Sequence, residues 1–160
     1  LDMLCERALS RTTQGELLAR KQATQEKIAD AFIELLQFKL QVLHAAWVVD
    51  QKGGHAARKE IAAVKVATPK VYREAVLRTM QLHGALGVSN EMPLANMLMA
   101  AVTMGIADGP TEVHKFTVAR EVLKDYSAAD GDWPSEHLPE RRAAARAQYA
   151  DLLERSLADL

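Results

Sequence analysis

Apolar residues recur every three or four positions along most of the chain, which is the spacing of one face of an α-helix. Glycine or proline lies at each interruption of this pattern, and both residues end helices. The pattern predicts helices at residues 1–10, 17–51, 56–82, 93–103, 110–126 and 140–160. We therefore expect an all-α bundle of long antiparallel helices, with extra short helices.

The two longest predicted helices carry apolar residues on more than one face. In residues 17–51, one stripe of large side chains is widened by three neighbours: Ile28, Phe32, Leu35, Leu36, Leu43 and Trp47, then Ile33, Leu40 and Val48. We expect this helix to be covered on more than one side, with Trp47 packed inside the bundle. In residues 56–82, Pro69 removes a backbone donor and predicts a kink near residues 67–68.

Residues 81–120 hold most of the irregular backbone that the sequence predicts. Glycines and prolines punctuate this stretch: Gly84, Gly87, Pro93, Gly105, Gly109 and Pro110. In a helical protein such residues mark helix ends, caps and close backbone approaches. Because His83, Glu91 and Asp108 lie in the same stretch, it is the first place to search for a functional site.

Composition and charge narrow the classes of partner. The chain has 160 residues, with 20 Lys and Arg against 21 Asp and Glu, so no field of one sign is available to hold nucleic acid or an anionic membrane. Aromatic residues make up only 5%, which favours helices over sheets. No continuous apolar run approaches the ~20 residues that span a bilayer. The single Cys5 fits a reducing compartment, and we expect a cytoplasmic protein.

Two regions are expected along the chain. Residues 1–128 form the helical-bundle domain, and residues 129–160 form a loop followed by a C-terminal helical extension. Gly131 and Pro134 mark the loop. Because Leu1 already falls within a helical pattern, we expect the chain to be a piece of a longer protein.

Asp108 has two interpretations. A carboxylate just before a helix, followed by Gly109 and Pro110, is commonly a helix cap, and caps are far commoner than catalytic acids. The functional interpretation is a general base at the rim of a pocket, where burial makes a carboxylate more basic. The pattern of residues leaves both interpretations open.

Other candidate sites have weaker support. No metal site is expected, because the histidines fall on separate elements without an acidic or Cys partner at ligand spacing: His44, His55, His83 and His114. Residues 84–87 lack the Lys-Ser/Thr pair and the preceding strand of a phosphate loop. The methionines within residues 92–104 are most simply core residues. Arg11 lies in a loop and could pair with a carboxylate or hold a phosphate.

Several segments, in order, resemble the C-terminal signature of acyl-CoA dehydrogenases. These are Gln-Leu-His-Gly-Ala-Leu-Gly at 81–87, Glu-Met-Pro at 91–93, Ile-Ala-Asp-Gly-Pro-Thr-Glu-Val at 106–113 and Val-Ala-Arg at 118–120. Upstream, Arg-Thr-Thr-Gln-Gly at 11–15, with Gln22, resembles the segment that opens the same domain. The resemblance covers about residues 1–125 and implies the antiparallel four-helix bundle of this family's C-terminal domain.

The resemblance implies a flavoprotein that dehydrogenates an acyl-CoA thioester. In such enzymes a carboxylate removes the α-proton while the β-hydrogen leaves as hydride to FAD. Asp108 matches this base, its backbone amide matches a donor to the thioester carbonyl, and Gly109 lies beside the substrate. The resemblance implies two sets of FAD contacts. One set matches positions that touch the FAD of the partner subunit: Arg11, Thr13, Gln22, Gln81, Leu82, His83, Gly84 and Ala85. Thr111 and Glu112 match positions that contact FAD just after the base.

The resemblance also implies partners. The positions where this sequence differs from the family pattern concern the substrate. Family members act on acyl-CoA, pass electrons to an electron-transfer acceptor and form homodimers or homotetramers. Asp108 stands where Glu is usual, and the Ala-Asp-Gly-Pro form resembles a subgroup linked to unusual, branched or hydroxylated acyl-CoAs. Because this chain has no candidate for the family's other domains, we expect it to be inactive alone.

Two alternatives accompany this interpretation. The first is a non-catalytic helical oligomerisation module, in which Asp108 is only a cap and the full-length protein binds no flavin. The second is a related flavin-dependent acyl-CoA oxidase or monooxygenase, which keeps the fold and the cofactor but changes the reaction. A flavin spectrum tests the first alternative, and the choice of electron acceptor tests the second.

Overall fold

The computed structural model describes residues 1–152 and residue 154. Contacts divide the chain into two units, Leu1–Leu123 and Lys124–Leu160. The first unit holds, in order, α1 (Asp2–Ser10), strands β1 (Thr12–Thr13) and β2 (Glu16–Leu17), the 3-10 helix η1 (Leu18–Arg20), α2 (Gln22–Lys52), α3 (Arg58–His83), the 3-10 helix η2 (Gly84–Val88), α4 (Leu94–Met104) and α5 (Thr111–Leu123). The second unit holds α6 (Leu138–Gln148).

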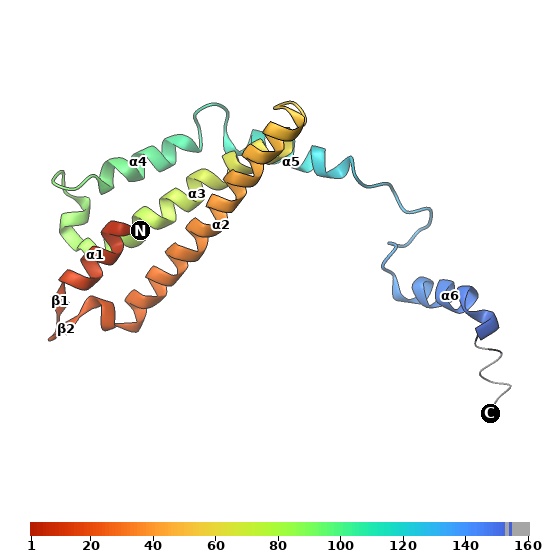
Figure 1. Cartoon of the computed structure of the whole chain (residues 1–160), viewed down its shortest axis with the longest axis horizontal. Coiled ribbons are helices and arrows are strands. Elements are labelled where there is room, and N and C mark those ends of the chain that lie inside the picture. Colours follow the sequence, from red (N-terminus) through yellow and green to blue (C-terminus); the bar gives the residue numbers. More distant parts are fainter. Residues whose placement is uncertain (153, 155–160) are drawn as a thin grey trace. The chain divides into compact units, whose positions relative to one another are not determined.

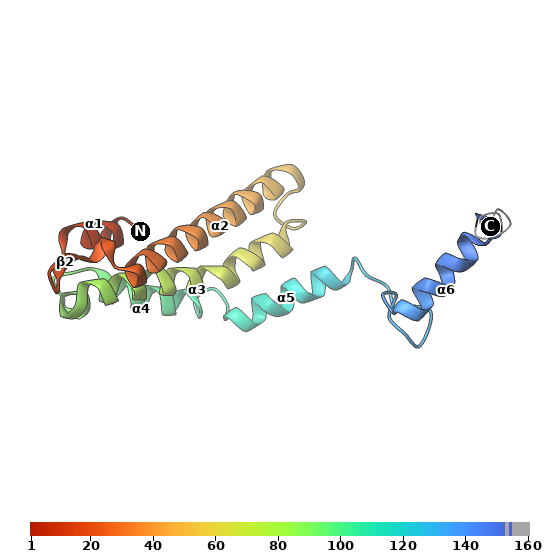
Figure 2. The same cartoon turned by 90° about the horizontal axis from the view of Figure 1, so that it is seen from below.

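Helix α3 is the central element of the first unit. It contacts α1, α2, α4, α5 and η2. Figure 1 and Figure 2 both show α2 and α3 side by side and antiparallel, with α4 along another side of α3. Leu4 and Leu94 are the largest fully buried side chains, and alanines make up most of the remaining buried apolar residues. The predicted all-α bundle is therefore confirmed.

The fully buried side chains of helix α2 are small, and many of its large apolar side chains are exposed. Its buried residues are Thr24, Ala31, Ala45 and Val48. Its exposed apolar residues form a stripe, here called the α2 stripe: Phe32, Ile33, Leu36, Leu40, Val42, Leu43 and Trp47. The prediction that Trp47 packs inside the bundle is wrong, since this residue is 56% exposed.

Helix α2 is also long and apolar enough, on average, to cross a membrane by length and composition alone. This measure is an average and differs from the length of a continuous apolar run, which Gln37, Lys39 and Gln41 divide in α2. The apolarity comes from the α2 stripe, and Glu34 and Lys39 interrupt it. Core helices of soluble proteins pass the same test, so a single helix of this kind is weak evidence for a membrane span.

A short hairpin replaces the expected loop and the first residues of the expected long helix. Thr12 pairs with Leu17 and Thr13 with Glu16. Gln14 and Gly15 form the turn with φ of 54° and 78°. Two consecutive left-handed residues match the twist of a two-residue hairpin. Helix α2 consequently begins at Gln22 rather than at residue 17.

Helix α3 runs from Arg58 to His83 through Pro69. In the turn before the proline, the Thr68 hydroxyl donates to the Val64 carbonyl oxygen at 2.8 Å. Such a bond from a Thr side chain bends helices slightly. The predicted kink near residues 67–68 stays a prediction.

The helices after α3 lie where the sequence predicts them, but their first and last residues differ from the predicted ones. The Pro110 carbonyl oxygen accepts from the Val113 amide at 3.0 Å, so Pro110 caps α5 rather than occupying its first helical position. Helix α5 ends at Leu123 instead of residue 126. In the second unit α6 begins at Leu138. The end of the helix predicted for residues 140–160 falls on residues 153 and 155–160, which lie outside the described residues.

Candidate functional site

One cavity brings together two of the segments that the sequence singled out. It has a volume of about 540 Å³ and lies between α1, the β1–β2 hairpin and the end of α3; we call it the hairpin cavity. Its lining is Arg7, Arg11, Thr13, Leu18, Thr24, Gln81, Leu82, His83, Gly84, Ala85 and Leu86. The hairpin segment and the end of α3 are far apart in the sequence, so the fold itself creates this cavity.

The end of α3 presents its backbone to the hairpin cavity. Gly84 has φ of 61°, in the left-handed region where glycine is favoured, and it turns the chain from α3 into η2. Gly84 and Ala85 are exposed. A ligand can therefore approach the main chain of this segment closely.

Two side chains hold the end of α3 in place. The Nε of Arg7 donates to the Leu82 carbonyl oxygen at 3.3 Å, which joins α1 to α3. His83 is buried, and its Nδ1 lies 2.8 Å from the Thr79 carbonyl oxygen. Because a carbonyl oxygen only accepts, Nδ1 must carry the proton of this hydrogen bond.

The charge of the hairpin cavity favours an anionic ligand. Arg7 and Arg11 both line it, and no Asp or Glu does. A guanidinium presents several N–H donors in a plane that matches phosphate and carboxylate oxygens. The sequence interpretation missed Arg7. The available signal was its position one helical turn before Arg11, which places both guanidinium groups near one end of α1.

Gln22 does not line this cavity. It is the first residue of α2, and its side-chain amide donates to the Glu26 carboxylate at 3.0 Å. Its predicted contact with FAD stays a prediction.

Asp108 lies in the turn between α4 and α5. Asp108 and Gly109 both have left-handed backbones, with φ of 57° and 96°. The turn is bonded on either side, because Ala107 N donates to Thr103 O at 2.8 Å and Thr111 N donates to Gly105 O at 3.0 Å. Asp108 is exposed. Among the described residues, no hydrogen bond or ion pair involves its carboxylate, so the structure does not support the cap interpretation.

His114 of α5 packs over this turn. Its Nε2 lies 3.1 Å from the Asp108 carbonyl oxygen. A Cβ added to Gly109 would lie 3.1 Å from the same Nε2, so the ring occupies the space beside the glycine. The turn, Gly109 and His114 therefore form one packed unit.

Thr111 and Glu112 line a different cavity, of about 380 Å³, between α3, α4 and α5. Lys70, Arg73 and Lys115 also line it. The Thr111 hydroxyl donates to the Gly105 carbonyl oxygen at 3.2 Å. The structure thus places these two predicted FAD contacts apart from the hairpin cavity.

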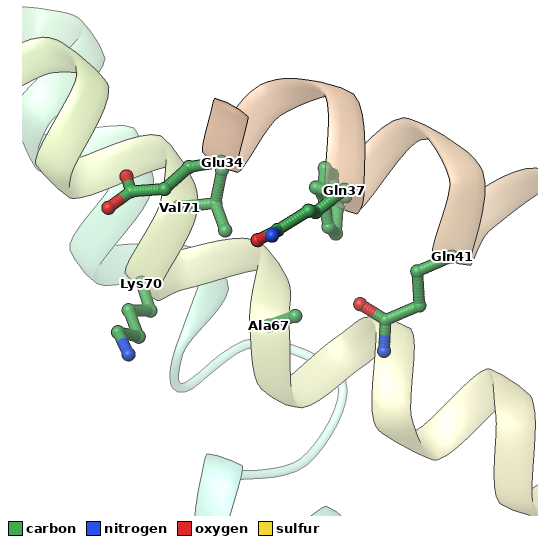
Figure 3. Close-up of a pocket in the computed structure, with 7 residues that line it drawn as sticks. Glu34, Gln37, Gln41, Ala67, Lys70 and Val71 are labelled. Atoms are coloured by element: carbon green, nitrogen blue, oxygen red, sulfur yellow. The ribbon is translucent and has the colours of Figure 1, made fainter. Parts of the chain in front are cut away.

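A third cavity, of about 230 Å³, lies in the groove between α2 and α3. Figure 3 shows Gln37 and Gln41 extending from α2 toward α3, with Glu34 and Lys70 at the other end of the groove. Arg78 donates to Glu34 beside it, and this hydrogen bond holds the pKa of Glu34 below its usual value. The groove coincides with none of the predicted site residues.

The described residues contain no group of three or more His, Cys, Asp or Glu side chains that could hold a metal ion. This finding concerns residues 1–152 and 154 alone.

Known proteins share both the sequence and the fold of the first unit. The family described as acyl-CoA dehydrogenase, C-terminal domain, matches residues 1–123. Acyl-CoA dehydrogenase family member 11 from Rattus norvegicus is 41% identical over 125 residues, which is 78% of this chain and 16% of the rat protein. The (R)-benzylsuccinyl-CoA dehydrogenase of Thauera aromatica is 35% identical over 78% of this chain and 30% of its own length.

Solved structures of the same family share the fold of the first unit. An acyl-CoA dehydrogenase family protein from Mycobacterium abscessus superimposes with a TM-score of 0.76 and 40% identity, over 79% of this chain and 31% of that protein. The chain therefore spans less than a third of the relatives it matches. The family match spans the whole first unit, and the chain belongs to the acyl-CoA dehydrogenase family, of which it contains the C-terminal helical domain.

Proposed function

We propose that the full-length protein carrying this domain is an FAD-dependent acyl-CoA dehydrogenase that forms an α,β double bond in an acyl-CoA thioester. The observation that carries the proposal is the hairpin cavity, where Arg11 and Thr13 meet the segment 81–85. These are the residues that match FAD contacts of the family. The family membership of residues 1–123 supports the same reaction class.

The lining of the hairpin cavity fits FAD. The diphosphate of FAD is anionic, and the cavity carries Arg7 and Arg11 without a carboxylate. The exposed main chain at Gly84 and Ala85 gives the cofactor a surface to lie against. We propose that these residues hold FAD together with Thr13, Gln81, Leu82 and His83. Gln22, Thr111 and Glu112 lie outside this cavity, and we propose that they contact FAD in the assembled full-length protein. When bound, FAD supplies the acceptor for the β-hydrogen and its electron pair.

Asp108 is the proposed base. Its carboxylate takes the α-hydrogen as a proton, and the electron pair of the broken C–H bond becomes the second bond between Cα and Cβ. The exposed carboxylate, which has no partner among the described residues, is free to accept that proton. The Asp108 amide is proposed to donate to the thioester carbonyl, which makes the α-hydrogen more acidic. Gly109 lies beside the substrate in this proposal.

Self-association is the second part of the proposal. The α2 stripe leaves seven apolar side chains of one helix exposed. Patches of this kind mark interfaces in proteins of known assembly. We propose a homodimer or homotetramer, with acyl-CoA as substrate and an electron-transfer acceptor as redox partner.

The absorbance spectrum of the purified full-length protein tests the proposal. We expect flavin bands, and we expect anaerobic addition of butanoyl-, octanoyl- or a branched acyl-CoA to bleach them. The isolated 160-residue chain should dehydrogenate none of these thioesters. A colourless full-length protein would favour an oligomerisation module. Reoxidation by oxygen rather than by an electron-transfer flavoprotein would favour an oxidase.

A further inference from the structure

Two side chains tether the turn that carries Asp108: the Thr111 hydroxyl donates to the Gly105 carbonyl oxygen at its start, and His114 alone among the described residues bonds to Asp108 itself. His114 reaches back from the first turns of α5, and its Nε2 lies 3.1 Å from the Asp108 carbonyl oxygen. A carbonyl oxygen only accepts, so Nε2 carries the proton of this bond. The hydrogen bonds of Ala107 and Thr111 close the turn on either side but do not involve Asp108 or Gly109.

The backbone of Asp108 needs such a tether. A left-handed φ of 57° is unfavourable for a residue with a Cβ, by about 1–2 kcal/mol. The neighbouring φ of 96° at Gly109 gives the chain further freedom. Without a bond from outside the turn, the pair can relax to other backbone conformations. The direction of the Asp108 Cα–Cβ bond would change with them.

The side chain of Asp108 cannot compensate for such a change. An Asp carboxylate has one methylene and one rotatable bond fewer than a Glu carboxylate. Its position is therefore set more tightly by the backbone that carries it. Proton transfer requires the reacting atoms at close range, and a displacement of about 1 Å can cost ~10²-fold in rate.

We propose that His114 is a positioning residue, which fixes the Asp108 carboxylate through its hydrogen bond to the Asp108 carbonyl oxygen and its packing against Gly109. The proposal rests on the proposed function of Asp108 as base. It also accounts for the glycine at 109, where a Cβ would lie 3.1 Å from Nε2.

Two amide substitutions separate the hydrogen bond from simple packing. His114→Gln places an amide N–H near the position of Nε2, whereas His114→Asn places it near Nδ1, too short to reach the carbonyl. His114→Leu keeps bulk but removes the donor. His55→Leu, in the exposed connection before α3, serves as the matched control.

The measurement is exchange of the α-hydrogens of octanoyl-CoA with solvent deuterium, catalysed by the full-length FAD-bound protein and followed by mass spectrometry. It reports on the base directly, and the thermal midpoint and bound FAD report on folding. We expect His114→Leu and His114→Asn to slow exchange by roughly tenfold to hundredfold. His114→Gln and His55→Leu should remain within a few-fold of the unchanged protein, with folding and FAD content preserved.

Exchange at an unchanged rate in His114→Leu would overturn the inference, as would an equal loss in His114→Gln and His114→Leu. If the Leu variant does not fold, the comparison of Gln with Asn still decides the matter. Asp108→Asn separates this inference from the proposed function. Exchange at the full rate in Asp108→Asn would show that Asp108 is not the base. Loss of exchange in Asp108→Asn together with normal exchange in His114→Leu would refute only the positioning role of His114.

Discussion

Arg78 on α3 donates two hydrogen bonds to the carboxylate of Glu34 on α2, with Nη1–Oε2 of 2.6 Å and Nη2–Oε1 of 2.9 Å. The pair joins α2 and α3, the two longest helices. Paired fork-to-fork geometry of this kind is the strongest form of ion pair. Both side chains remain partly exposed, so solvent screens much of the attraction.

Glu34→Gln should lower stability by about 0.5–1 kcal/mol near neutral pH. The Arg78 hydrogen bonds lower the pKa of Glu34. The carboxylate therefore adds stability above the pKa it has in the unfolded chain, and this stability is lost as the pH falls through the lowered folded value. Urea unfolding at neutral pH and at pH below about 4 measures both effects. The Gln variant should differ from the parent chain at neutral pH and converge with it in acid.

Glu6→Gln, on the exposed face of α1, is the control for this series. It should leave the stability near neutral pH unchanged. An equal loss of stability in Glu6→Gln and Glu34→Gln would show that the ion pair does not join α2 to α3.

Gly87→Ala should destabilise the domain by about 1–3 kcal/mol. An added Cβ would lie 2.7 Å from the Met80 carbonyl oxygen and 2.9 Å from Met80 Cα, and these backbone atoms of α3 cannot move aside cheaply. Gly54→Ala is the matched control, because nothing lies within 4 Å of a Cβ there and its φ is not left-handed. Equal thermal midpoints for the two variants would contradict the close packing of η2 on α3.

Replacing the α2 stripe should reduce self-association without unfolding the domain. Leu36 and Leu40 are 45% and 58% exposed, so Ser at both positions removes little of the core. Sedimentation velocity should show a smaller assembly for the double variant, with helical circular dichroism unchanged. Leu9→Ser on α1, also exposed, should leave the assembly as it is. An unchanged sedimentation coefficient in the double variant would show that the α2 stripe is not part of the interface.

Arg11→Gln should weaken FAD binding by the full-length protein. Removing one guanidinium from the hairpin cavity takes away a charge-assisted contact to an anionic ligand, worth about 1.5–3 kcal/mol. Fluorescence titration of the apoprotein with FAD measures the loss. Arg20→Gln, on exposed η1 and outside the cavity lining, should bind FAD normally. Equal affinities of the two variants would place FAD away from the hairpin cavity.

The helices were predictable because their apolar periodicity is long and their ends carry glycine or proline. The hairpin was not, because two strands of two residues are too short to show an alternating pattern. The periodicity of apolar residues also predicted the α2 stripe, but it does not show which surface covers this stripe. The α2 residues that line the groove facing α3 are Glu34, Gln37, Phe38 and Gln41, none of which belongs to the α2 stripe.

The sequence predicted which residues belong to the candidate site but not how the fold brings them together. Family resemblance singled out Arg11 and residues 81–85, but only the fold shows that they line one cavity. Arg7 and His114 contact the carbonyl oxygens of Leu82 and Asp108. Such contacts depend on tertiary geometry, so the presence of an Arg or a His in the sequence does not predict them.

Asp108→Asn in the full-length protein tests whether Asp108 is the base of an acyl-CoA dehydrogenase. Asn keeps the shape of the side chain but cannot take the α-proton, and a general base contributes about 10²–10⁴-fold to rate. Asp50→Asn, at the exposed end of α2, is the matched control. The measurement is anaerobic bleaching of bound FAD by the acyl-CoA that is fastest with the unchanged protein. We expect Asp108→Asn to retain FAD and to bleach at least about a hundredfold more slowly, while Asp50→Asn is unaffected; bleaching at a near-normal rate in Asp108→Asn would show that Asp108 is not the base.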